Sequence, residues 1–455
     1  MRGRLRKAAA HPSYRRCAAA FGILKPRVAV YTGEGASHSW IWFCDLLERL
    51  CLFDIGFITD SDILGGALRD FDVLLIGGGD TYAMAGSMGA SGAREIEDFV
   101  RSGGQYHGSC AGAYLVLSEV DLEPFAPFSL IEGDMLNVMR EPPAPLCLEH
   151  KYLAPYGSGW VFHPVYGEVE LAAGPAARGL DVFEANGPIA APLFGGPVLS
   201  VADESCVVAD YTGATDRAAF LWPRDEAERL IKGKQAFVVR RLGDGTASAS
   251  GPHLEHPLFP ESNALLASVL VKHWNRCSRI AGVAPALNRG PSSLSASLAP
   301  TKPDILTLRG SDPKTCIQEI KCQVSNARIV GFGLEKTPVT WKIGVKVWEP
   351  EKIRMFLDVA WDRLPFLESQ AGSGLLQAAG LEELASGYAG VTGLAKTLRI
   401  EVESGRDSQA EAQSLLTRLK ELTANFLALY FELRLQEQAG RDRPETGDGA
   451  GWQAG

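Results

Sequence analysis

Residues 105–117 read QYHGSCAGAYLVL, a strand-like segment that passes directly into a helix-like one. At the junction, Gly108, Cys110 and Gly112 fit the pattern Gly-x-Cys-x-Gly, the cysteine version of a nucleophile elbow. Such a turn strains the backbone of its central residue, and glycine two positions to either side avoids clashes with side chains. The segment therefore predicts an α/β fold in which the sulfur of Cys110 stands above the carboxyl edge of a sheet.

The position of Cys110 also predicts its reactivity. The positive end of the helix that follows favours the thiolate over the thiol and lowers the cysteine pKa. A buried cysteine beside a glycine-rich turn is the structural alternative, because a bare Gly-x-Cys-x-Gly also occurs by chance. The strand pattern before Cys110 and the helix pattern after it favour a nucleophile.

The segments on both sides of the elbow alternate between strand and helix patterns. The strand-like runs are residues 27–31, 54–58, 71–76, 105–109, 206–209, 219–222 and 235–240. The helix-like runs are residues 39–51, 93–102, 111–117 and 263–275. This alternation predicts an α/β domain over residues 27–280, with a mostly parallel sheet and helices on both faces. Residues 120–200 are rich in proline and glycine, so we expect long excursions from the sheet there.

The length of 455 residues allows two or three domains of about 150 residues each. Residues 1–26 carry arginine and lysine but no acidic residue, which predicts a basic, disordered N-terminal tail; an organelle transit peptide is the alternative. Residues 281–303 have the composition of a linker, and residues 440–455 that of a disordered tail. Between them, residues 304–439 are expected to form a second domain.

The second domain is expected to be a smaller α+β or helical region. It has strand-like runs at residues 327–332 and 340–348, a helical run at residues 351–364 and a long helix over residues 409–436. Ser408 and Glu411 fit a capping box at the start of the long helix.

The long helix carries an apolar stripe with coiled-coil spacing. Its members are Leu415, Leu419, Leu422, Phe426, Leu429 and Leu433. Four further residues widen the apolar face, namely Leu416, Leu427, Tyr430 and Phe431. The wider face favours packing in a bundle within the chain, and a homodimer through helix 409–436 is the alternative.

The overall composition excludes several classes of protein. A net charge of −9 provides no basic field for nucleic acid or an anionic membrane, and no apolar run approaches the ~18 residues of a membrane span. Nine cysteines without a CxxC pair fit a reducing compartment, so we predict a cytoplasmic protein, with organelle import as the alternative. The sequence gives no reason to expect a metal or another cofactor.

A nucleophilic cysteine needs a base, and His253 stands out among the eight histidines. Glu255 follows it by two residues, and on an extended segment these side chains point to the same side, so the carboxylate can orient the imidazole. His256 would point the other way. A surface histidine in a proline-flanked turn is the alternative, and His107, inside the elbow strand, fits a buried core histidine.

An oxyanion site is expected where residues 77–79, all glycine, end the strand before the elbow. The backbone N–H groups of Gly78 and Gly79, together with that of Ala111, are predicted to hold a tetrahedral oxyanion. A phosphate-binding loop is the alternative, but neither Gly-x-x-x-x-Gly-Lys-[Ser/Thr] nor Gly-x-Gly-x-x-Gly occurs here.

A series of motifs in this order resembles a known family. The segments are residues 30–37 (VYTGEGAS), 76–80 (IGGGD), 103–106 (GGQY), 108–114 (GSCAGAY), 194–197 (FGGP) and 250–255 (SGPHLE). Together they resemble the biotin-protein ligase N-terminal domain family, within the class I glutamine amidotransferase-like superfamily. The resemblance implies a flavodoxin-like fold and a triad of Cys110, His253 and Glu255.

The resemblance also implies ligand-binding positions in the glycine turns, namely Gly33, Gly35, Ser37, Asp80, Gly195 and Gly196. Two features depart from the family. His107 occupies a strand position that is usually apolar, and nothing after residue 300 resembles the catalytic domain of a biotin ligase. We therefore expect no biotin transfer by this chain alone.

The leading functional expectation is a cysteine hydrolase that acts on a small amide or carboxamide. A glutamine amidotransferase would in addition need an acceptor for the ammonia that it releases. This acceptor would be a domain of the C-terminal region or a separate partner, such as a ligase. A non-catalytic ligand-binding or regulatory module that keeps the elbow as scaffold is the second class, and a peptidase is the third.

Overall fold

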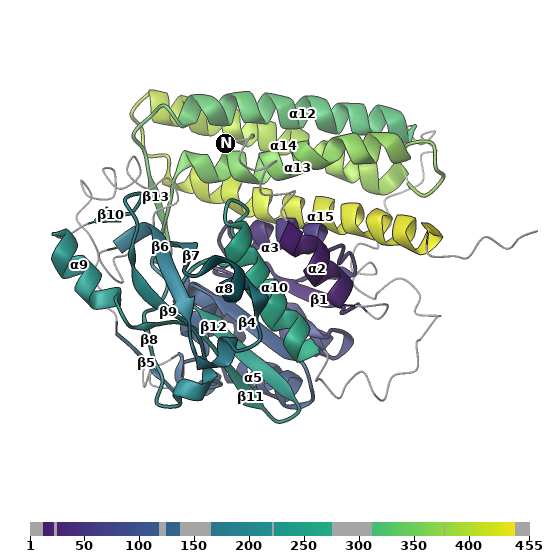
Figure 1. Ribbon diagram of the computed structural model, residues 1–455. Coiled ribbons are helices and arrows are strands. Elements are labelled where there is room, and N and C mark those ends of the chain that lie inside the picture. The colour runs from purple at the N-terminus through teal and green to yellow at the C-terminus, as the bar shows by residue number, and fades with distance from the viewer. Residues whose placement is uncertain are drawn as a thin grey trace, which may run out of the picture.

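The computed structural model describes residues 12–21, 25–117, 124–136, 165–220, 223–274, 312–376 and 378–441. Within these ranges, a large sheet and a group of four long helices dominate the molecule (Figure 1). The expected linker at residues 281–303 and nearly all of the expected tail at residues 440–455 lie outside the described residues.

The parallel half of the sheet contains four of the strand-like runs of the sequence and a fifth strand before His253. Its strands are β1 (Val28–Tyr31), β2 (Ile55–Ile58), β3 (Val73–Ile76), β4 (Gln105–Ser109) and β12 (Gly245–Ser250). They lie in the order β2-β1-β3-β4-β12, and every neighbouring pair is parallel. All four residues of β1 and of β3 are buried, as expected for strands covered on both faces.

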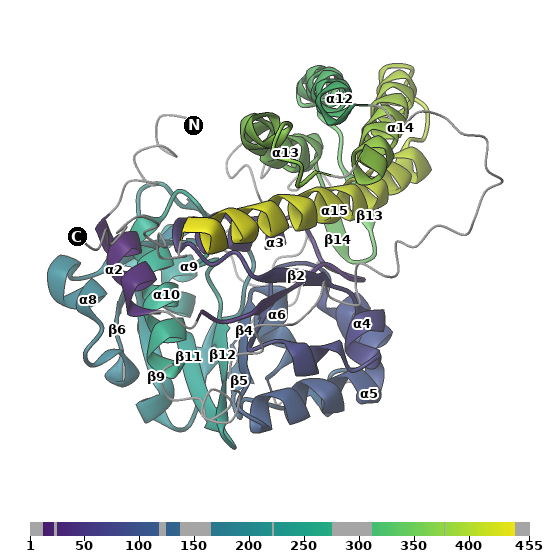
Figure 2. The same ribbon diagram turned by 90° about the vertical axis from the view of Figure 1, so that its right-hand side faces the viewer.

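Helices connect these strands and cover them. They are α3 (Trp40–Arg49), α4 (Asp60–Leu64), α5 (Thr81–Arg101), α6 (Ala111–Leu115) and α10 (Pro260–Trp274). Because crossovers between parallel strands are right-handed, α3 lies on one face of the sheet, and α4 and α5 lie on the other (Figure 2). The α/β class, with a parallel sheet between helices, is confirmed.

The other half of the sheet is antiparallel. It contains β5 (Asp134–Met135), β6 (Val165–Ala173), β7 (Ile189–Leu193), β8 (Leu199–Ser200), β9 (Val207–Ala214), β10 (Ala219–Phe220) and β11 (Gln235–Leu242). The helices here are α8 (Asp181–Asn186) and α9 (Arg224–Ile231). Short 3₁₀ turns cover Ala67–Asp70, Ala126–Phe128, Pro175–Ala177 and Glu204–Cys206.

The expectation that residues 120–200 leave the sheet is corrected by β6 and β7. These strands pair with each other antiparallel, and β6 also pairs with β9, so this part of the chain belongs to the sheet. Proline and glycine interrupt the strand pattern of residues 120–200. The strands that pair with β6, namely β7 and β9, follow it only after intervening turns and helices.

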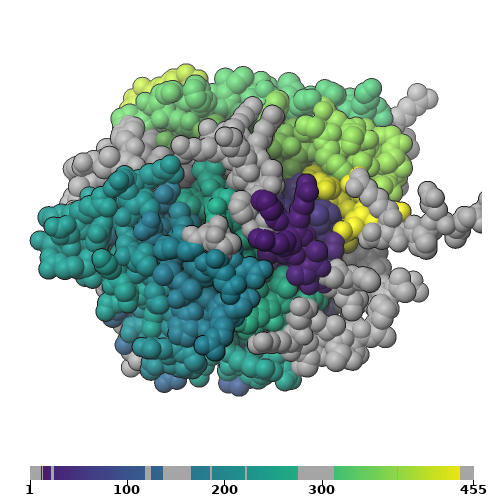
Figure 3. All heavy atoms as spheres, viewed as in Figure 1, coloured from purple at the N-terminus to yellow at the C-terminus, as the bar shows by residue number. Residues whose placement is uncertain are grey.

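The N-terminal segment is also different from the expected disordered tail. Pro12–Ala20 form helix α2, which packs against α10 and is visible on the surface in Figure 3. Tyr14 is 3% exposed, and its hydroxyl donates a hydrogen bond to Asn263 Oδ1 at 2.7 Å. Cys17 and Phe21 are buried beside it, so apolar contacts hold a segment whose composition suggested a tail.

The C-terminal region is a group of four helices with one β-hairpin. The helices are α12 (Pro313–Leu334), α13 (Pro350–Gln370), α14 (Ala378–Glu403) and α15 (Gln409–Arg441). The hairpin pairs β13 (Trp341–Ile343) with β14 (Lys346–Trp348). The expected strand at residues 327–332 is wrong, because these residues continue α12, in which Val324, Ala327 and Val330 line one buried face.

Helix α15 lies between the other C-terminal helices and the α/β domain, where it also packs on the edge strand β2 (Figures 1 and 2). Five of the six stripe residues are at most 3% exposed, and Leu429 is partly buried. The four residues that widen the stripe are buried as well. Contacts within the chain therefore cover this face. Among the described residues, no helix has the length and apolar character needed to cross a membrane.

Candidate active site

The elbow at the end of β4 has the backbone geometry that its sequence suggests. Cys110 has a φ of +51°, in the left-handed region that residues other than glycine rarely adopt. A Cβ atom on Gly108 would lie 2.2 Å from the carbonyl oxygen of Gly112, and one on Gly112 would lie 2.3 Å from the carbonyl oxygen of Ile76. Both glycines are thus required by close backbone contacts, which hold the nucleophile position at the start of α6.

Three side chains meet at the carboxyl ends of the adjacent strands β4 and β12. The Cys110 thiol and the His253 ring are neighbours, and each shifts the pKa of the other. On its other side, His253 Nδ1 lies 2.7 Å from Glu255 Oε1. The Cys110 N–H also donates to the carbonyl of Ser250 at 2.9 Å, which ties the elbow to the strand that precedes His253. The structure therefore brings Cys110, His253 and Glu255 together, with His253 hydrogen-bonded to Glu255.

Ser109 adds a contact that the sequence did not predict. Its hydroxyl donates to Glu255 Oε1 at 2.8 Å, and Glu255 is completely buried. A carboxylate that accepts both bonds is fixed in orientation and in turn fixes the imidazole. The position of Ser109 beside the nucleophile is a weak sequence signal for this role.

The electrostatics favour charge separation between Cys110 and His253. Burial opposes an imidazolium, but the charge of Glu255 and the hydrogen bond to Cys110 raise the pKa of His253 to about 9. Burial also opposes a thiolate, but the hydrogen bond and charge of His253, together with the charge of Lys346, lower the pKa of Cys110. The pair is therefore suited to a thiolate and an imidazolium near neutral pH.

The other histidines near the site have different surroundings. His107 Nδ1 is bonded to Ser248 Oγ at 3.0 Å, and the ring packs edge-on against Phe43 and Phe237. Burial lowers the pKa of His107 to about 4, so it stays neutral at physiological pH. His256 accepts a bond from the N–H of Leu258 and packs on Trp42 rather than on Cys110.

The predicted oxyanion donors fall into two groups. The Gly78 N–H donates to Ser39 Oγ at 2.7 Å, so it is already occupied. The N–H groups of Gly79 and Ala111 have no acceptor among the described residues. The N–H groups of Gly79 and Ala111 remain the candidate donors to an oxyanion beside Cys110. Ser39, which occupies the N–H of Gly78, is a residue that the sequence did not single out.

The glycine loops expected to bind a ligand pack closely on one another. Ser37 Oγ donates to the carbonyl of Gly78 at 2.9 Å, and the Asp80 N–H donates to the carbonyl of Gly35 at 2.8 Å. The carbonyl of Gly33 accepts a bond from Lys420 Nζ. These loops surround the carboxyl ends of β1 and β3, but the polar groups named here are used within the chain.

On the opposite side of the elbow, a second pair of glycines approaches β12. The carbonyl of Gly195 accepts a bond from the Tyr114 hydroxyl at 3.2 Å. A Cβ atom on Gly196 would lie 1.8 Å from the carbonyl oxygen of Gly251. The carbonyl of Phe194 lies 3.9 Å from the sulfur of Cys110. This loop therefore forms one wall of the Cys110 site.

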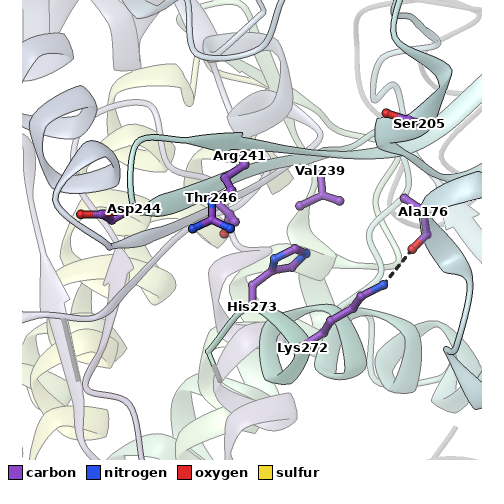
Figure 4. A pocket seen from close by; sticks show the side chains of 8 residues that line it. All are labelled: Ala176, Ser205, Val239, Arg241, Asp244, Thr246, Lys272 and His273. Atoms are coloured by element: carbon purple, nitrogen blue, oxygen red, sulfur yellow. Dashed lines mark hydrogen bonds between the residues drawn. The ribbon is translucent and has the colours of Figure 1, made fainter. Parts of the chain in front are cut away.

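A cavity of about 240 Å³ lies elsewhere on the domain (Figure 4). Its lining includes Thr246, at the amino end of β12, and Lys272 and His273, near the end of α10. Cys110 stands at the carboxyl ends of the strands, so this cavity is separate from it. None of the predicted site residues lines the cavity.

The comparisons with known proteins bear on the N-terminal part of this arrangement. Residues 26–132 match the family model described as biotin-protein ligase, N terminal. Over these residues, the predicted family is confirmed. This biotin-protein ligase N-terminal match includes β1 to β4 and the elbow with Cys110, and it ends before His253 and Glu255.

Solved structures with some similarity include a beta-galactosidase from Bacillus circulans sp. alkalophilus, at 14% identity and a TM-score of 0.27, covering 58% of this chain and 32% of that one. Another is the exo-beta-1,4-mannosidase Op5Man5 from Opitutaceae bacterium strain TAV5, at 12% identity and a TM-score of 0.26, covering 55% of this chain and 35% of that one. The matched region thus spans about a third of those chains. No curated protein matches the chain.

Proposed function

We propose that the α/β domain is a cysteine hydrolase of the amidase or glutamine amidotransferase-like type, which acts on a small amide. The observation that carries this proposal is the grouping of Cys110, on a strained elbow, with His253 and the Glu255 carboxylate bonded to it. In such a grouping, the cysteine acts as nucleophile, the histidine as acid and base, and the carboxylate as the group that orients the histidine.

The geometry supports the following reaction. The Cys110 thiolate attacks the amide carbonyl carbon, and the oxyanion accepts bonds from the N–H groups of Gly79 and Ala111. Because Nδ1 of His253 faces Glu255, its Nε2 carries the proton that is given to the departing amine. A water molecule then loses a proton to Nε2 and attacks the thioester, which releases a carboxylic acid and restores the Cys110 thiolate and the His253 imidazolium.

The strand order adds support for the superfamily that we propose. The parallel strands, read as β2-β1-β3-β4-β12, follow the order 2-1-3-4-5 of flavodoxin-like sheets. In such sheets, functional residues gather beyond the carboxyl ends of the strands, which is where Cys110 and His253 lie. A thiolate nucleophile also suits a reducing cytoplasm, and the cysteines in the described ranges are free thiols.

A binding or regulatory module is the second candidate, and one observation favours it. Cys110 is 6% exposed and His253 is 4% exposed, so the site is closed to solvent in this conformation. A closed site fits a scaffold that has lost catalysis. It also fits an enzyme that opens for its substrate, or one that passes ammonia to a partner protein.

Ammonia release separates these candidates. Purified protein is incubated with a panel of small carboxamides, ammonia is quantified, and the acyl-enzyme is sought by intact-mass spectrometry. We expect turnover that falls at least about a thousandfold in Cys110→Ser and in His253→Ala. Cys322→Ala, which removes an exposed thiol on α12, is the matched control and keeps wild-type turnover. Equal ammonia release by wild type and Cys110→Ser would exclude the hydrolase.

A further inference from the structure

The β13–β14 hairpin connects the C-terminal region to the Cys110 site. It extends from the long helices to the α/β domain (Figure 2). At its tip, the N–H of Val345 donates to Asp80 Oδ2 at 2.8 Å. Asp80 also accepts a bond from the N–H of Ala83 and so caps α5 directly after the glycines of the predicted oxyanion site.

The tip fits closely against Asp80. Gly344 has a φ of +62°, and a Cβ atom there would lie 2.2 Å from Asp80 Oδ2. Gly78, two residues before Asp80, lies against His253, because a Cβ atom on Gly78 would lie 2.7 Å from Cε1 of that ring. The hairpin tip is therefore in contact with the loop that forms a wall of the site.

The base of the hairpin is held firmly. Trp341 and Trp348 face each other in the strand pairing and are at most 7% exposed. The Trp341 indole donates to Ser408 Oγ at 2.9 Å, so this hydroxyl, which was expected to act in a capping box, anchors the hairpin. Lys352 Nζ donates to the carbonyl of Val347 and pairs with Glu349. These contacts fix the direction in which the strand residues point.

Lys346, the first residue of β14, is 8% exposed. Unlike the ammonium of Lys352, that of Lys346 makes no hydrogen bond or ion pair with another described residue. The residue before it, Val345, is hydrogen-bonded to Asp80, next to the glycines of the predicted oxyanion site, so Lys346 is buried close to that loop. The charge of Lys346 lowers the pKa of the Cys110 thiol and of the buried His38 ring. Burial and the neighbouring charge of Lys352 lower the pKa of Lys346 to about 8, so the ammonium is still mostly protonated at pH 7.

A buried ammonium without a paired anion is unfavourable unless something compensates it. The attraction of Lys346 to Cys110, Asp80 and Glu349 compensates part of this cost. Asp80 and Glu349 are themselves used, by the hairpin tip and by Lys352. The buried Lys346 ammonium, whose charge acts on the Cys110 thiol, is thus electrostatically suited to attract a small anion to this site.

We propose that Lys346 is the anion-binding group of the Cys110 site, supplied by the C-terminal region, and that the amide substrate also carries a carboxylate or another small anionic group. The substrate part of this inference rests on the proposed hydrolase. The anion-binding part does not, because it concerns the environment of the thiol alone.

A pair of alkylating reagents tests the proposal without a substrate. Iodoacetate and iodoacetamide form the same S–C bond with the Cys110 thiolate and release the same iodide, but only iodoacetate is anionic. A change in thiolate content alters both rates alike, so the ratio of the two rate constants reports anion binding. Labelling at Cys110 is followed by peptide mass spectrometry, and thermal melting verifies that each variant is folded.

We expect Lys346→Met to lower the iodoacetate-to-iodoacetamide ratio at Cys110 by about tenfold, because a charge interaction at close range is lost. Lys346→Arg keeps the charge and retains most of the ratio. Lys342→Met, which removes an exposed charge from the same hairpin, is the control and leaves the ratio unchanged.

Three results would overturn the proposal. An unchanged ratio in Lys346→Met shows that the lysine does not select anions, and an equal fall in both rates shows that it acts on the thiolate only. The same fall of the ratio in Lys342→Met shows that any positive charge on the hairpin attracts iodoacetate, and that Lys346 forms no specific anion site. If the ratio depends on Lys346 but no carboxamide releases ammonia, the anion site stands and the hydrolase fails.

Discussion

At the scale of single residues, the site depends on how charge is shared between Cys110 and His253. Glu255 has no exposed surface, and its Oε1 accepts bonds from both Ser109 and His253. A buried carboxylate of this kind stabilises an imidazolium far more than an exposed one, because water does not screen it. The thiolate on the other side of His253 benefits from that same imidazolium.

The first prediction concerns Glu255→Gln. Removing the charge should lower the pKa of His253 from about 9 towards the ordinary value near 6.5. Titration of the His253 Cε1–H resonance by NMR measures this pKa. Glu34→Gln, which removes an exposed carboxylate, is the control. An unchanged His253 pKa in Glu255→Gln would show that the carboxylate does not govern the imidazole.

The sign of the same shift gives the pH dependence of stability. The folded-state pKa of His253 lies above its unfolded value, so its protonation stabilises the fold fully below about pH 6.5. This contribution is lost as the pH rises through about 9. The loss should be smaller in Glu255→Gln, in which the two pKa values are closer.

At the scale of elements, α15 links packing in the C-terminal region to the α/β domain. Its apolar residues point in several directions around the helix, which explains why the stripe is wider than a coiled-coil seam. Leu422 is 3% exposed and contacts the backbone of α14 at Gly387, where a Cβ atom would lie 2.5 Å from its Cδ1. Helices approach closely where one of them has glycine.

The second prediction is that Leu422→Asp strongly destabilises the C-terminal helices. The loss includes roughly 1.5–3 kcal/mol for burying leucine, and burial of a carboxylate adds to it. Urea unfolding followed by circular dichroism should show an earlier or less cooperative transition. Leu435→Asp, at a position that is 36% exposed on the same helix, should have little effect.

Light scattering on the same variants tests the homodimer expected as the alternative. A dimeric wild type that becomes a folded monomer in Leu422→Asp would indicate a seam between two copies. Unchanged mass together with an unchanged unfolding curve would contradict the packing of Leu422 altogether.

At the scale of the whole molecule, a cluster of polar contacts joins the C-terminal helices to α3. Arg363 of α13 is 6% exposed and donates to Asp45 and Glu48 at 2.8 Å each. From α15, the Tyr430 hydroxyl donates to Glu48, and Arg434 lies 3.4 Å from the same carboxylate. These contacts position α13 and α15 on the α/β domain.

The third prediction is that Arg363→Met weakens this connection. Its two carboxylate partners are about a quarter exposed, so the loss should be about 1.5–3 kcal/mol, the range for hydrogen bonds to charged groups, rather than the cost of a fully buried pair. Differential scanning calorimetry should show the C-terminal helices unfolding at lower temperature than the α/β domain. Arg418→Met, which breaks an exposed pair with Glu421, is the control; matching curves for both variants would refute the connection.

The sequence alone determined the features that depend on short-range geometry. The elbow is predictable from the sequence because the backbone around Cys110 leaves no room for side chains at Gly108 and Gly112, independently of the rest of the chain. The parallel strands are readable from short apolar runs between helical ones, and the pairing of His253 with Glu255 follows from their separation by two residues. Each of these depends on residues within one segment.

Tertiary structure decided the features that depend on which segments meet. The sequence of α2 resembles a basic tail, and it becomes a helix because Tyr14 and Phe21 find apolar partners. Residues 327–332 are rich in strand-forming side chains, yet packing against neighbouring helices keeps them in α12. Lys346 reaches the Cys110 site from the other region of the chain. The burial and the charge interactions of Lys346 depend on residues far away in the sequence, so no local sequence pattern predicts its place at the site.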